Sequence, residues 1–362
     1  MIKKMKEIMI LKNKHKTKHK KIIFVGLVRT GQPAICGETM KNQLITEQLR
    51  KYNYDVCIMD FFGWRQRPWI IVNLLLKLLF YPRVPLILSS SSQNIFPVIK
   101  LMYFTKSKRV IIFWVVGGDF HTKVAMGVHK IKHVNYITAN IVQSDTMALE
   151  LKKYGVNNAI YVPNSKPIKY IPQKQSRSST NIRFVFLSRI LPEKGCNLII
   201  EAINQLNTDG FINEYSVDFY GKIDDAYYQE FTSKLGMLEN ANYKGFLKLR
   251  EYAEYDEFSK YDVMLFPTFW KSEGFAGVFI DAFIAGLPII VSDWNHNKEF
   301  IKDGKTGIVI SPQNVSELAI AMRSVIEKKI DITKMSKNCQ AEAMNYDIDK
   351  VITKELLEKI GL

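Results

Sequence analysis

The sequence predicts an α/β fold with two domains, each built on a parallel β-sheet that helices cover on both faces. The chain has 362 residues, more than the roughly 250–300 at which a single hydrophobic core stops growing. In both halves, short continuous apolar runs alternate with helical segments, which is the pattern of strands buried on both faces. Between the halves, residues 166–180 are rich in Lys, Pro, Ser and Gln and show no periodicity, as expected of a linker.

Each half is expected to follow the βαβ pattern. In the first half, a helix is predicted over Glu38–Lys51, with strands at Lys21–Val28, Asp55–Asp60, Val84–Ser89, Val110–Val116 and Asn140–Gln143. In the second half, strands are predicted at Asn181–Ser188, Tyr215–Tyr220, Val263–Pro267 and Pro288–Ser292, and helices at Cys196–Leu206, Ala226–Leu235 and Gly274–Ala285. We therefore divide the chain into a basic tail (1–20), an N-terminal domain (21–168), a C-terminal domain (169–345) and a C-terminal helix (346–362). In such sheets a ligand binds at the carboxyl ends of the strands, which points to the cleft between the domains.

The net charge of +16 indicates a polyanionic partner, such as an anionic membrane face, a phosphorylated substrate or nucleic acid. Residues 1–21 carry nine Lys and one acid, Glu7. This segment is either a solvated tail or a lipid-contacting one, in which each Lys near the surface contributes about 1 kcal/mol. The four Cys lie far apart, without a CxxC or Cys/His cluster, so we expect reduced, buried thiols in a cytoplasmic protein. No signal peptide and no metal site are expected.

Residues 64–81 combine Trp and Arg with the apolar stretch IIVNLLLKLLFY. The stretch is shorter than the about 20 apolar residues that a helical membrane span requires. It fits a helix lying at a membrane interface, and it also fits a buried core helix of the N-terminal domain. Together with the basic tail, the first alternative predicts peripheral attachment to the anionic cytoplasmic face of a membrane.

The segment from Glu273 to Asp281 follows an apolar strand and opens a predicted helix. Amides in the first turn of a helix have no intrahelical partners and bind anions, and Gly274 and Gly277 allow a ligand close to the backbone. The two carboxylates, eight positions apart, could hold sugar or ribose hydroxyls while the amides hold phosphate. By spacing alone, they could equally be a helix-dipole partner and a solvated surface acid.

A second loop, SRILPEKG, follows another predicted strand and carries Arg189 and Lys194. Both cations can reach a diphosphate, Arg as a bidentate fork and Lys as a point charge. Taken alone, this could also be a surface loop of a basic protein. The one Asp-x-Asp, Asp347-Ile348-Asp349, lies far from both loops in sequence, and we interpret it as a helix N-cap and not as a metal site.

Taken in order, several stretches resemble the C-terminal domain of retaining family 4 glycosyltransferases with the GT-B fold, in which two Rossmann-like domains face each other. They are FVFLSRILPEKGCNLIIEAI, DFYGKI, YKGFL, YDVMLFPTFWKSEGFAGVFIDAFIAGLPIIVSD and IKDGKTGIVI. The resemblance extends from residue 182 to about residue 330. The N-terminal half resembles the family only in its βα pattern and in VPNSKPI at 162–168.

The resemblance implies roles for individual residues. Glu273 stands at the first acid of the family's E-x7-E motif, which contacts the donor sugar, and Asp281 replaces the second Glu, which binds ribose. Arg189 and Lys194 match the pair that neutralises the donor diphosphate without a metal. Packing on the nucleotide base is implied for Phe246 and Leu247. Further donor contacts are implied for the stretch that matches the family's GFG and the residues after it: Gly274, Phe275, Ala276, Gly277 and Val278.

The acceptor is expected in the N-terminal half. The loop GQPAICGE, which contains Gly37, follows the first strand and in GT-B enzymes approaches the donor phosphates and the acceptor; a plain turn glycine is the alternative. Asp119 and His121 follow another strand, where the family often places a His or Asp near the reacting sugar. A loop His is more often structural, and that alternative stays open.

These features predict transfer of a hexose, with retention, from a nucleotide diphosphate sugar to a glycan or polyprenyl-linked acceptor in cell-surface polysaccharide or glycoconjugate synthesis. UDP is the favoured nucleotide, and no cofactor is expected, because the Arg/Lys pair and the helix terminus do the work of a cation. A sugar-nucleotide epimerase of the same fold and a non-catalytic sugar-binding relative are the alternatives. Charge alone would allow a nucleic-acid-binding protein, but the sequence has no RNP aromatics, zinc finger or basic recognition helix, so no nucleic-acid partner is expected.

Overall fold

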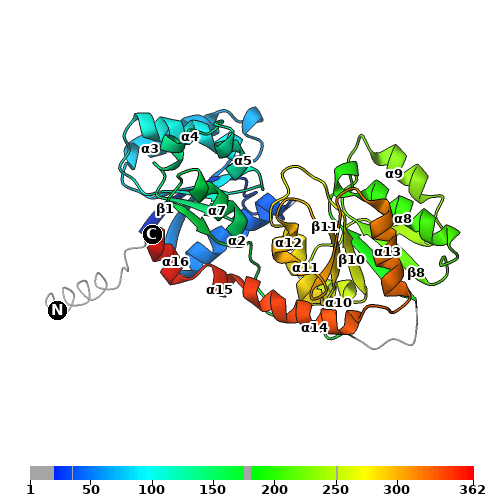
Figure 1. Ribbon diagram of the computed structural model, residues 1–362. Coiled ribbons are helices and arrows are strands. Elements are labelled where there is room, and N and C mark those ends of the chain that lie inside the picture. The colour runs from blue at the N-terminus through cyan, green and yellow to red at the C-terminus, as the bar shows by residue number, and fades with distance from the viewer. Residues whose placement is uncertain (1–19, 35, 175–180, 250–251) are drawn as a thin grey trace, which may run out of the picture.

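The structure is a computed structural model that describes residues 20–34, 36–174, 181–249 and 252–362. It forms two lobes (Figure 1). Residues 1–19, which make up nearly all of the predicted basic tail, lie outside the described residues.

The first lobe is built on a six-stranded parallel sheet with the strand order β2-β1-β3-β4-β5-β6. Its strands are β1 (Lys20–Gly26), β2 (Tyr54–Asp60), β3 (Leu86–Ser90), β4 (Ile111–Val115), β5 (Ala139–Val142) and β6 (Ala159–Tyr161). Its helices are α2 (Gly37–Lys51), α3 (Trp69–Phe80), α4 (Ser92–Phe104), α5 (Phe120–Ala125), α6 (Ile131–Val134) and α7 (Asp145–Lys153), with a 3-10 turn at Trp64–Gln66. Helices α3, α4, α5 and α7 contribute to the core on one face of the sheet, and α2 to the core on the other.

The second lobe repeats this plan with the strand order β12-β11-β10-β7-β8-β9, again all parallel. Its strands are β7 (Ile182–Leu187), β8 (Tyr215–Tyr220), β9 (Ala241–Tyr243), β10 (Val263–Phe266), β11 (Ile289–Ser292) and β12 (Gly307–Ile310). Its helices are α8 (Cys196–Thr208), α9 (Tyr228–Leu235), α10 (Tyr252–Phe258), α11 (Gly277–Ala285), α12 (Asn297–Phe300), α13 (Val315–Ile326) and α14 (Ile332–Ala343). The predicted pair of parallel-sheet α/β domains is therefore confirmed.

Each sheet contains a place where the strand order reverses. In the first lobe β1 and β3 are neighbours, and in the second lobe β7 and β10 are neighbours; we call these the first and second reversal points. Loops that leave neighbouring strands in opposite directions open a crevice at the carboxyl ends of the strands, and ligands of open α/β sheets bind there. The two reversal points are thus the places to look for a site.

The chain crosses between the lobes in two neighbouring segments. Lys166 N donates to Tyr346 O at 3.0 Å, and Ile348 N donates to Lys166 O at 2.9 Å. Asp347 is the N-cap of α15 (Ile348–Val351) and its side chain accepts from Asp349 N, as predicted. Helices α15 and α16 (Lys354–Lys359) bury apolar residues in the core of the first lobe, so two short helices replace the single predicted one, and with α14 they bridge the lobes in Figure 1.

Short or partly exposed elements are where the sequence predictions fall short. The strands β6 and β9 have three residues each and β12 has four, and all three are partly exposed, so they lack the continuous apolar run that marks a buried strand. The expectation of buried thiols is right for Cys196 and Cys339 but wrong for Cys36, which is exposed.

Residues 64–81 do not form a core helix. In α3 only Leu74 and Leu78 are buried. Most of the apolar side chains of this helix face outward, including Trp69, Leu79 and Phe80, with exposed fractions of 61%, 71% and 70%. The buried-core alternative is therefore wrong for most of this segment.

Candidate active site at the junction of the lobes

The loops that follow β7 and β10 bring two predicted residues, Lys194 and Glu273, into one buried ion pair. Lys194 ends a 3-10 turn after β7, Glu273 lies in the loop after β10, and their exposed fractions are 6% and 7%. Lys194 Nζ donates to Glu273 Oε2, and Thr268 Oγ1 donates to the same oxygen at 3.0 Å. Because β7 and β10 are the strands of the second reversal point, the pair lies where the fold favours ligand binding.

Arg189, the other predicted cation, is exposed and lies just after β7, at the start of the loop that follows this strand. Its guanidinium carbon lies 5.1 Å from the ring centroid of Trp270, in a cation–π contact. Phe269 N donates to Glu193 O at 2.8 Å, which links the loop that follows β7 to the loop that follows β10. A guanidinium over an aromatic ring keeps its N–H donors available, so Arg189 can bind an anion.

Helix α11 begins at Gly277, three residues later than predicted. Ala276 is its N-cap, with φ −66° and ψ 117°, and Gly274 belongs to the preceding loop. Phe279 N donates to Ala276 O at 3.0 Å. The helix therefore offers its free first-turn amides at Gly277 and Val278 and not at Gly274.

Asp281 lies inside α11 and has different partners from Glu273. Lys166 Nζ lies 2.5 Å from both carboxylate oxygens, and Tyr255 Oη donates to Oδ1 at 2.6 Å. A carboxylate offers about four acceptor positions, so about one is left for a ligand hydroxyl. Burial and the neighbouring carboxylate raise the pKa of Tyr255, which keeps its hydroxyl a donor to Asp281.

The first lobe meets the Glu273 loop through two glycines after β4. Gly118 N donates to Ser272 O at 3.1 Å, and a Cβ on Gly118 would lie 2.0 Å from Glu273 O. On the other side, a Cβ on Gly274 would lie 2.0 Å from Nε2 of Gln143, which follows β5. Gly118 requires glycine because it meets the backbone of the other lobe, whereas a side chain at position 274 would have to displace the Gln143 amide.

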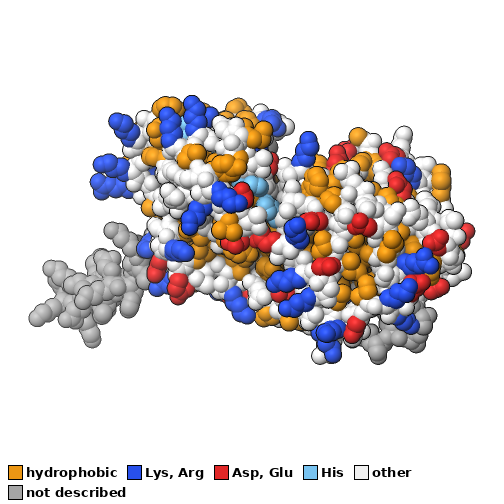
Figure 2. Space-filling model, in the orientation of Figure 1, with side chains coloured by type: hydrophobic (Ala, Val, Ile, Leu, Met, Phe, Trp, Pro, Cys, Tyr) orange, Lys and Arg blue, Asp and Glu red, His pale blue; other side chains and the backbone are white. Residues whose placement is uncertain are grey.

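The predicted first-lobe residues Asp119 and His121 lie at this junction. Asp119 pairs with Lys123 at 2.9 Å and accepts from Ser272 Oγ at 3.4 Å. The His121 ring lies 5.2 Å from the ring of His296, which follows β11, and Figure 2 shows histidine side chains between the lobes. Burial lowers the pKa of both rings, and the nearby His296 lowers that of His121 further. His121 Nδ1 and His296 Nε2 are buried and have no hydrogen-bond partner among the described residues, so two neutral imidazoles offer free nitrogens here.

Helix α12 adds a polar clamp between the lobes. The Glu299 carboxylate accepts from Ser144 Oγ and Asp145 N, both at 2.6 Å, at the N-terminus of α7. A carboxylate at this place also complements the dipole of α7. Sequence reasoning missed both Glu299 and His296, although their position just after β11 could have indicated them.

The remaining predicted residues are not part of the Lys194–Glu273 ion pair. Phe246 follows β9 and is 65% exposed, whereas Leu247 packs against the core of the second lobe. Phe275 stacks on Phe300 with ring centroids 3.9 Å apart, so its side chain belongs to the core. Gly37 is the first residue of α2, and a Cβ there would meet nothing within 4 Å, so the turn does not depend on glycine.

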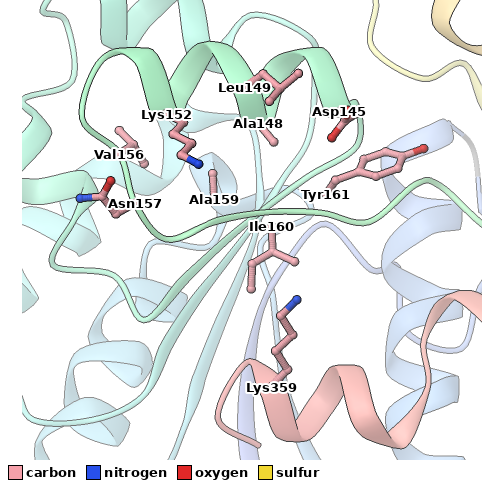
Figure 3. A pocket seen from close by; sticks show the side chains of 10 residues that line it. All are labelled: Asp145, Ala148, Leu149, Lys152, Val156, Asn157, Ala159, Ile160, Tyr161 and Lys359. Atoms are coloured by element: carbon pink, nitrogen blue, oxygen red, sulfur yellow. The ribbon is translucent and has the colours of Figure 1, made fainter.

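An open hollow of about 440 Å³ lies elsewhere, between α7, β6 and α16 (Figure 3). Lys152 of α7 and Lys359 of α16 point into it from opposite sides. None of the predicted site residues lines it. Since β6 is the edge strand of the first sheet, the hollow is a groove along a sheet edge and not part of the junction.

Comparison with known proteins bears on the family and the fold. Residues 167–345 match the family described as Glycosyl transferases group 1. The crystal structure of HepE from Anabaena in complex with UDP-glucose superposes with a TM-score of 0.69 at 15% identity, over 94% of this chain and 99% of that one. The fold is thus GT-B, as the sequence predicts.

Two curated relatives match parts of the chain. A 41.2 kDa protein in the cps region of Klebsiella pneumoniae is 25% identical over 171 residues, which are 47% of this chain and 44% of the relative. UDP-Gal:alpha-D-GlcNAc-diphosphoundecaprenol alpha-1,3-galactosyltransferase of Escherichia coli is 32% identical over 94 residues, 26% of this chain and 24% of the relative. The chain thus covers less than half the length of either.

Proposed function

We propose that this protein is a retaining glycosyltransferase that moves a hexosyl group from a UDP-sugar to a lipid-linked glycan during assembly of a cell-surface polysaccharide. The observation that carries the proposal is the buried Lys194–Glu273 pair, placed at the second reversal point against the glycines of the first lobe. The match to the group 1 family supports it. So do the UDP-glucose complex of HepE, the cps-region protein and the diphosphoundecaprenol-linked acceptor of the E. coli relative.

The arrangement of charges at the second reversal point suits a nucleotide diphosphate donor. The diphosphate binds to Arg189 and to the free amides of Gly277 and Val278, a combination of a fixed guanidinium and a helix N-terminus. Glu273, whose carboxylate is oriented by Lys194 and Thr268, accepts hydrogen bonds from the hexose hydroxyls.

Transfer with retention needs no enzymic nucleophile in this proposal. The bond between C1 of the hexose and the diphosphate oxygen breaks, and the acceptor oxygen bonds to C1 on the same face. The departing phosphate oxygen takes the acceptor proton, giving UDP and the new glycoside. Glu273 and Asp281 are each neutralised by their own lysine, Lys194 and Lys166, which does not suit the paired nucleophile and acid of a double displacement.

An acceptor on a polyprenyl lipid requires the protein to work at a membrane surface, and we propose that α3 provides the contact on the cytoplasmic face. Within the described residues, no helix is long and apolar enough to cross a membrane. The 12 residues of α3 are about 18 Å long, and the outward apolar side chains of this helix suit a position parallel to the bilayer surface. Apolar and basic side chains gather together over α3 and α4 in Figure 2, which is the pattern that favours anionic lipid.

The membrane contact is tested by sedimentation with phosphatidylglycerol-containing vesicles. Leu79→Ser with Phe80→Ser should reduce vesicle binding, because both side chains are about 70% exposed. Met237→Ser, at a 78% exposed position of the second lobe, is the matched control. Equal binding of both variants and the wild type would exclude α3 as the contact.

The activity is tested by incubating the protein with UDP-hexoses and polyprenyl diphosphate-linked sugars and measuring UDP release and product mass. UDP release that depends on acceptor supports transfer and opposes an epimerase. Arg189→Ala and Glu273→Gln should each lower kcat/KM at least about tenfold, the effect of losing one charge-assisted hydrogen bond. Unchanged transfer in both variants would refute the assignment of the site.

A further inference from the structure

The first reversal point carries its own cluster of charged side chains, which the donor site does not use. The first turns of α2 hold Glu38 and Lys41, three positions apart and therefore on one face of the helix. Glu38 hydrogen-bonds with the Ser90 side chain at the end of β3, which holds its pKa lower than burial alone would. Lys41 Nζ donates to Val115 O at the end of β4 at 3.0 Å. The cluster thus lies over the carboxyl ends of β3 and β4.

Buried hydrogen bonds fix α2 in this position. Asn42 is fully buried, and its Nδ2 donates to Leu27 O at 3.0 Å and to Ser89 O at 3.2 Å. Its Oδ1 accepts from Ser89 Oγ at 2.5 Å. These contacts join α2 to the strands on both sides of the first reversal point, so the Glu38 and Lys41 side chains leave a rigid helix.

The Glu38 carboxylate is only partly satisfied within the described part of the chain. Its Oε1 is buried and has no hydrogen-bond partner among the described residues. Burial raises the pKa of Glu38 and lowers that of Lys41 to about 7, as expected of charged groups that are partly withdrawn from water. A buried acceptor without a partner is costly, and such groups persist at sites where a ligand supplies the donor.

A short stretch of chain connects the cluster to the Glu273 loop. Only Val116, Gly117 and Gly118 follow Val115 before the chain touches the Glu273 loop. Three residues span at most about 11 Å. The Val115 carbonyl that Lys41 contacts is therefore only a few residues of chain from the Glu273 loop, and transfer requires an acceptor and a donor held close together.

We propose that Glu38 is an acceptor-binding residue whose free Oε1 accepts a hydrogen bond from a hydroxyl of the acceptor sugar. The inference rests on the proposed function and assigns the acceptor side of that reaction. The ligand class is an uncharged sugar hydroxyl, because a phosphate would be repelled by the carboxylate.

The test compares Glu38→Ala and Glu38→Gln with Glu47→Gln, an exposed acid on the same helix. Acceptor and donor are titrated separately in the transfer assay, and UDP binding is measured by calorimetry. Glu38→Ala should lower kcat/KM for the acceptor by about 10- to 100-fold, the range for a hydrogen bond to a charged group, with UDP affinity within about twofold of wild type. Glu38→Gln should lose less, since its amide oxygen still accepts one bond, and Glu47→Gln should match wild type.

The outcomes separate this inference from the function on which it rests. If the wild type binds no UDP-sugar and transfers nothing, the proposed function fails and the inference falls with it. If the wild type transfers and both Glu38 variants keep wild-type acceptor kcat/KM, only the inference is wrong. Equal losses of UDP and acceptor affinity in Glu38→Gln, with a lowered melting temperature, would make Glu38 a structural residue and also overturn the inference.

Discussion

Replacing Asp281 with Asn distinguishes a structural role of this carboxylate from ribose binding. The change leaves the Lys166 ammonium, whose side chain is only 15% exposed, without its counter-ion. Charges about 3 Å apart attract by roughly 5 kcal/mol at an effective dielectric constant of 20, and desolvation offsets part of this. Breaking a buried pair from one side costs about 3–5 kcal/mol, and we expect the lower end, about 3 kcal/mol, because Tyr255 can still donate to the Asn oxygen.

The assay is calorimetric unfolding, paired with UDP binding at the same pH and salt. A loss of 3 kcal/mol lowers the melting temperature of a domain of 150–250 residues by roughly 6–12 °C. UDP affinity should change by less than about threefold. Lys166 and Tyr255 already occupy most of the acceptor positions of the Asp281 carboxylate and leave only about one for a ligand. The control is Asp293→Asn, which breaks the exposed 2.9 Å pair with Lys298 and should cost no more than about 0.5 kcal/mol.

A second substitution sharpens the test. Adding Lys166→Met to Asp281→Asn removes the uncompensated ammonium and should restore most of the lost stability. An Asp281→Asn variant that melts within about 1 °C of wild type but binds UDP tenfold more weakly would refute the reasoning. It would assign the carboxylate to the ribose.

Three further substitutions test the junction and the pH response. Gly118→Ala places a methyl group against Glu273 O, which forces the lobes apart, so transfer should fall at least about tenfold in the enzymatic assay while UDP binding changes less. Glu299→Gln weakens the clamp at α7 and should enlarge the radius of gyration measured by small-angle scattering; an unchanged radius would contradict the clamp. Burial lowers the pKa of His129 to about 4 from the usual 6.5, so the unfolded chain binds a proton between these values that the folded chain does not. Unfolding free energy should therefore fall by about 2–3 kcal/mol as pH drops from 6.5 to 4, and denaturant titrations of His129→Phe should show a smaller fall.

Local sequence predicts the strands well where they are buried on both faces. The predicted strand at Tyr215–Tyr220 coincides with β8, and that at Pro288–Ser292 differs from β11 by one residue. The start of α11 was not predictable in this way. Gly274 lies in the loop close to Gln143 of the other lobe, and no local pattern reports such a neighbour.

In the candidate site, too, local sequence predicts some features, whereas others depend on distant parts of the chain. The motif spacing indicates Lys194 and Glu273 individually, and their pairing follows once β7 and β10 are known to be neighbours. The partner of Asp281 could not be predicted, because Lys166 lies 115 positions away in sequence and reaches α11 only through the crossing segment. Long-range pairing of this kind depends on the placement of whole lobes and not on local propensity.

The carboxylates at the two reversal points, Glu273 and Glu38, differ in whether their oxygens already accept hydrogen bonds. Glu273 Oε2 already accepts from Lys194 and Thr268, so its position is fixed before any substrate arrives. Glu38 Oε1 has no partner among the described residues. A fixed, paired acid suits the side that must hold a charged donor, whereas an unpaired acceptor suits the side that takes a neutral hydroxyl. Transfer requires both sides at once, so the Glu299 clamp that holds the lobes together should affect transfer more strongly than it affects donor binding.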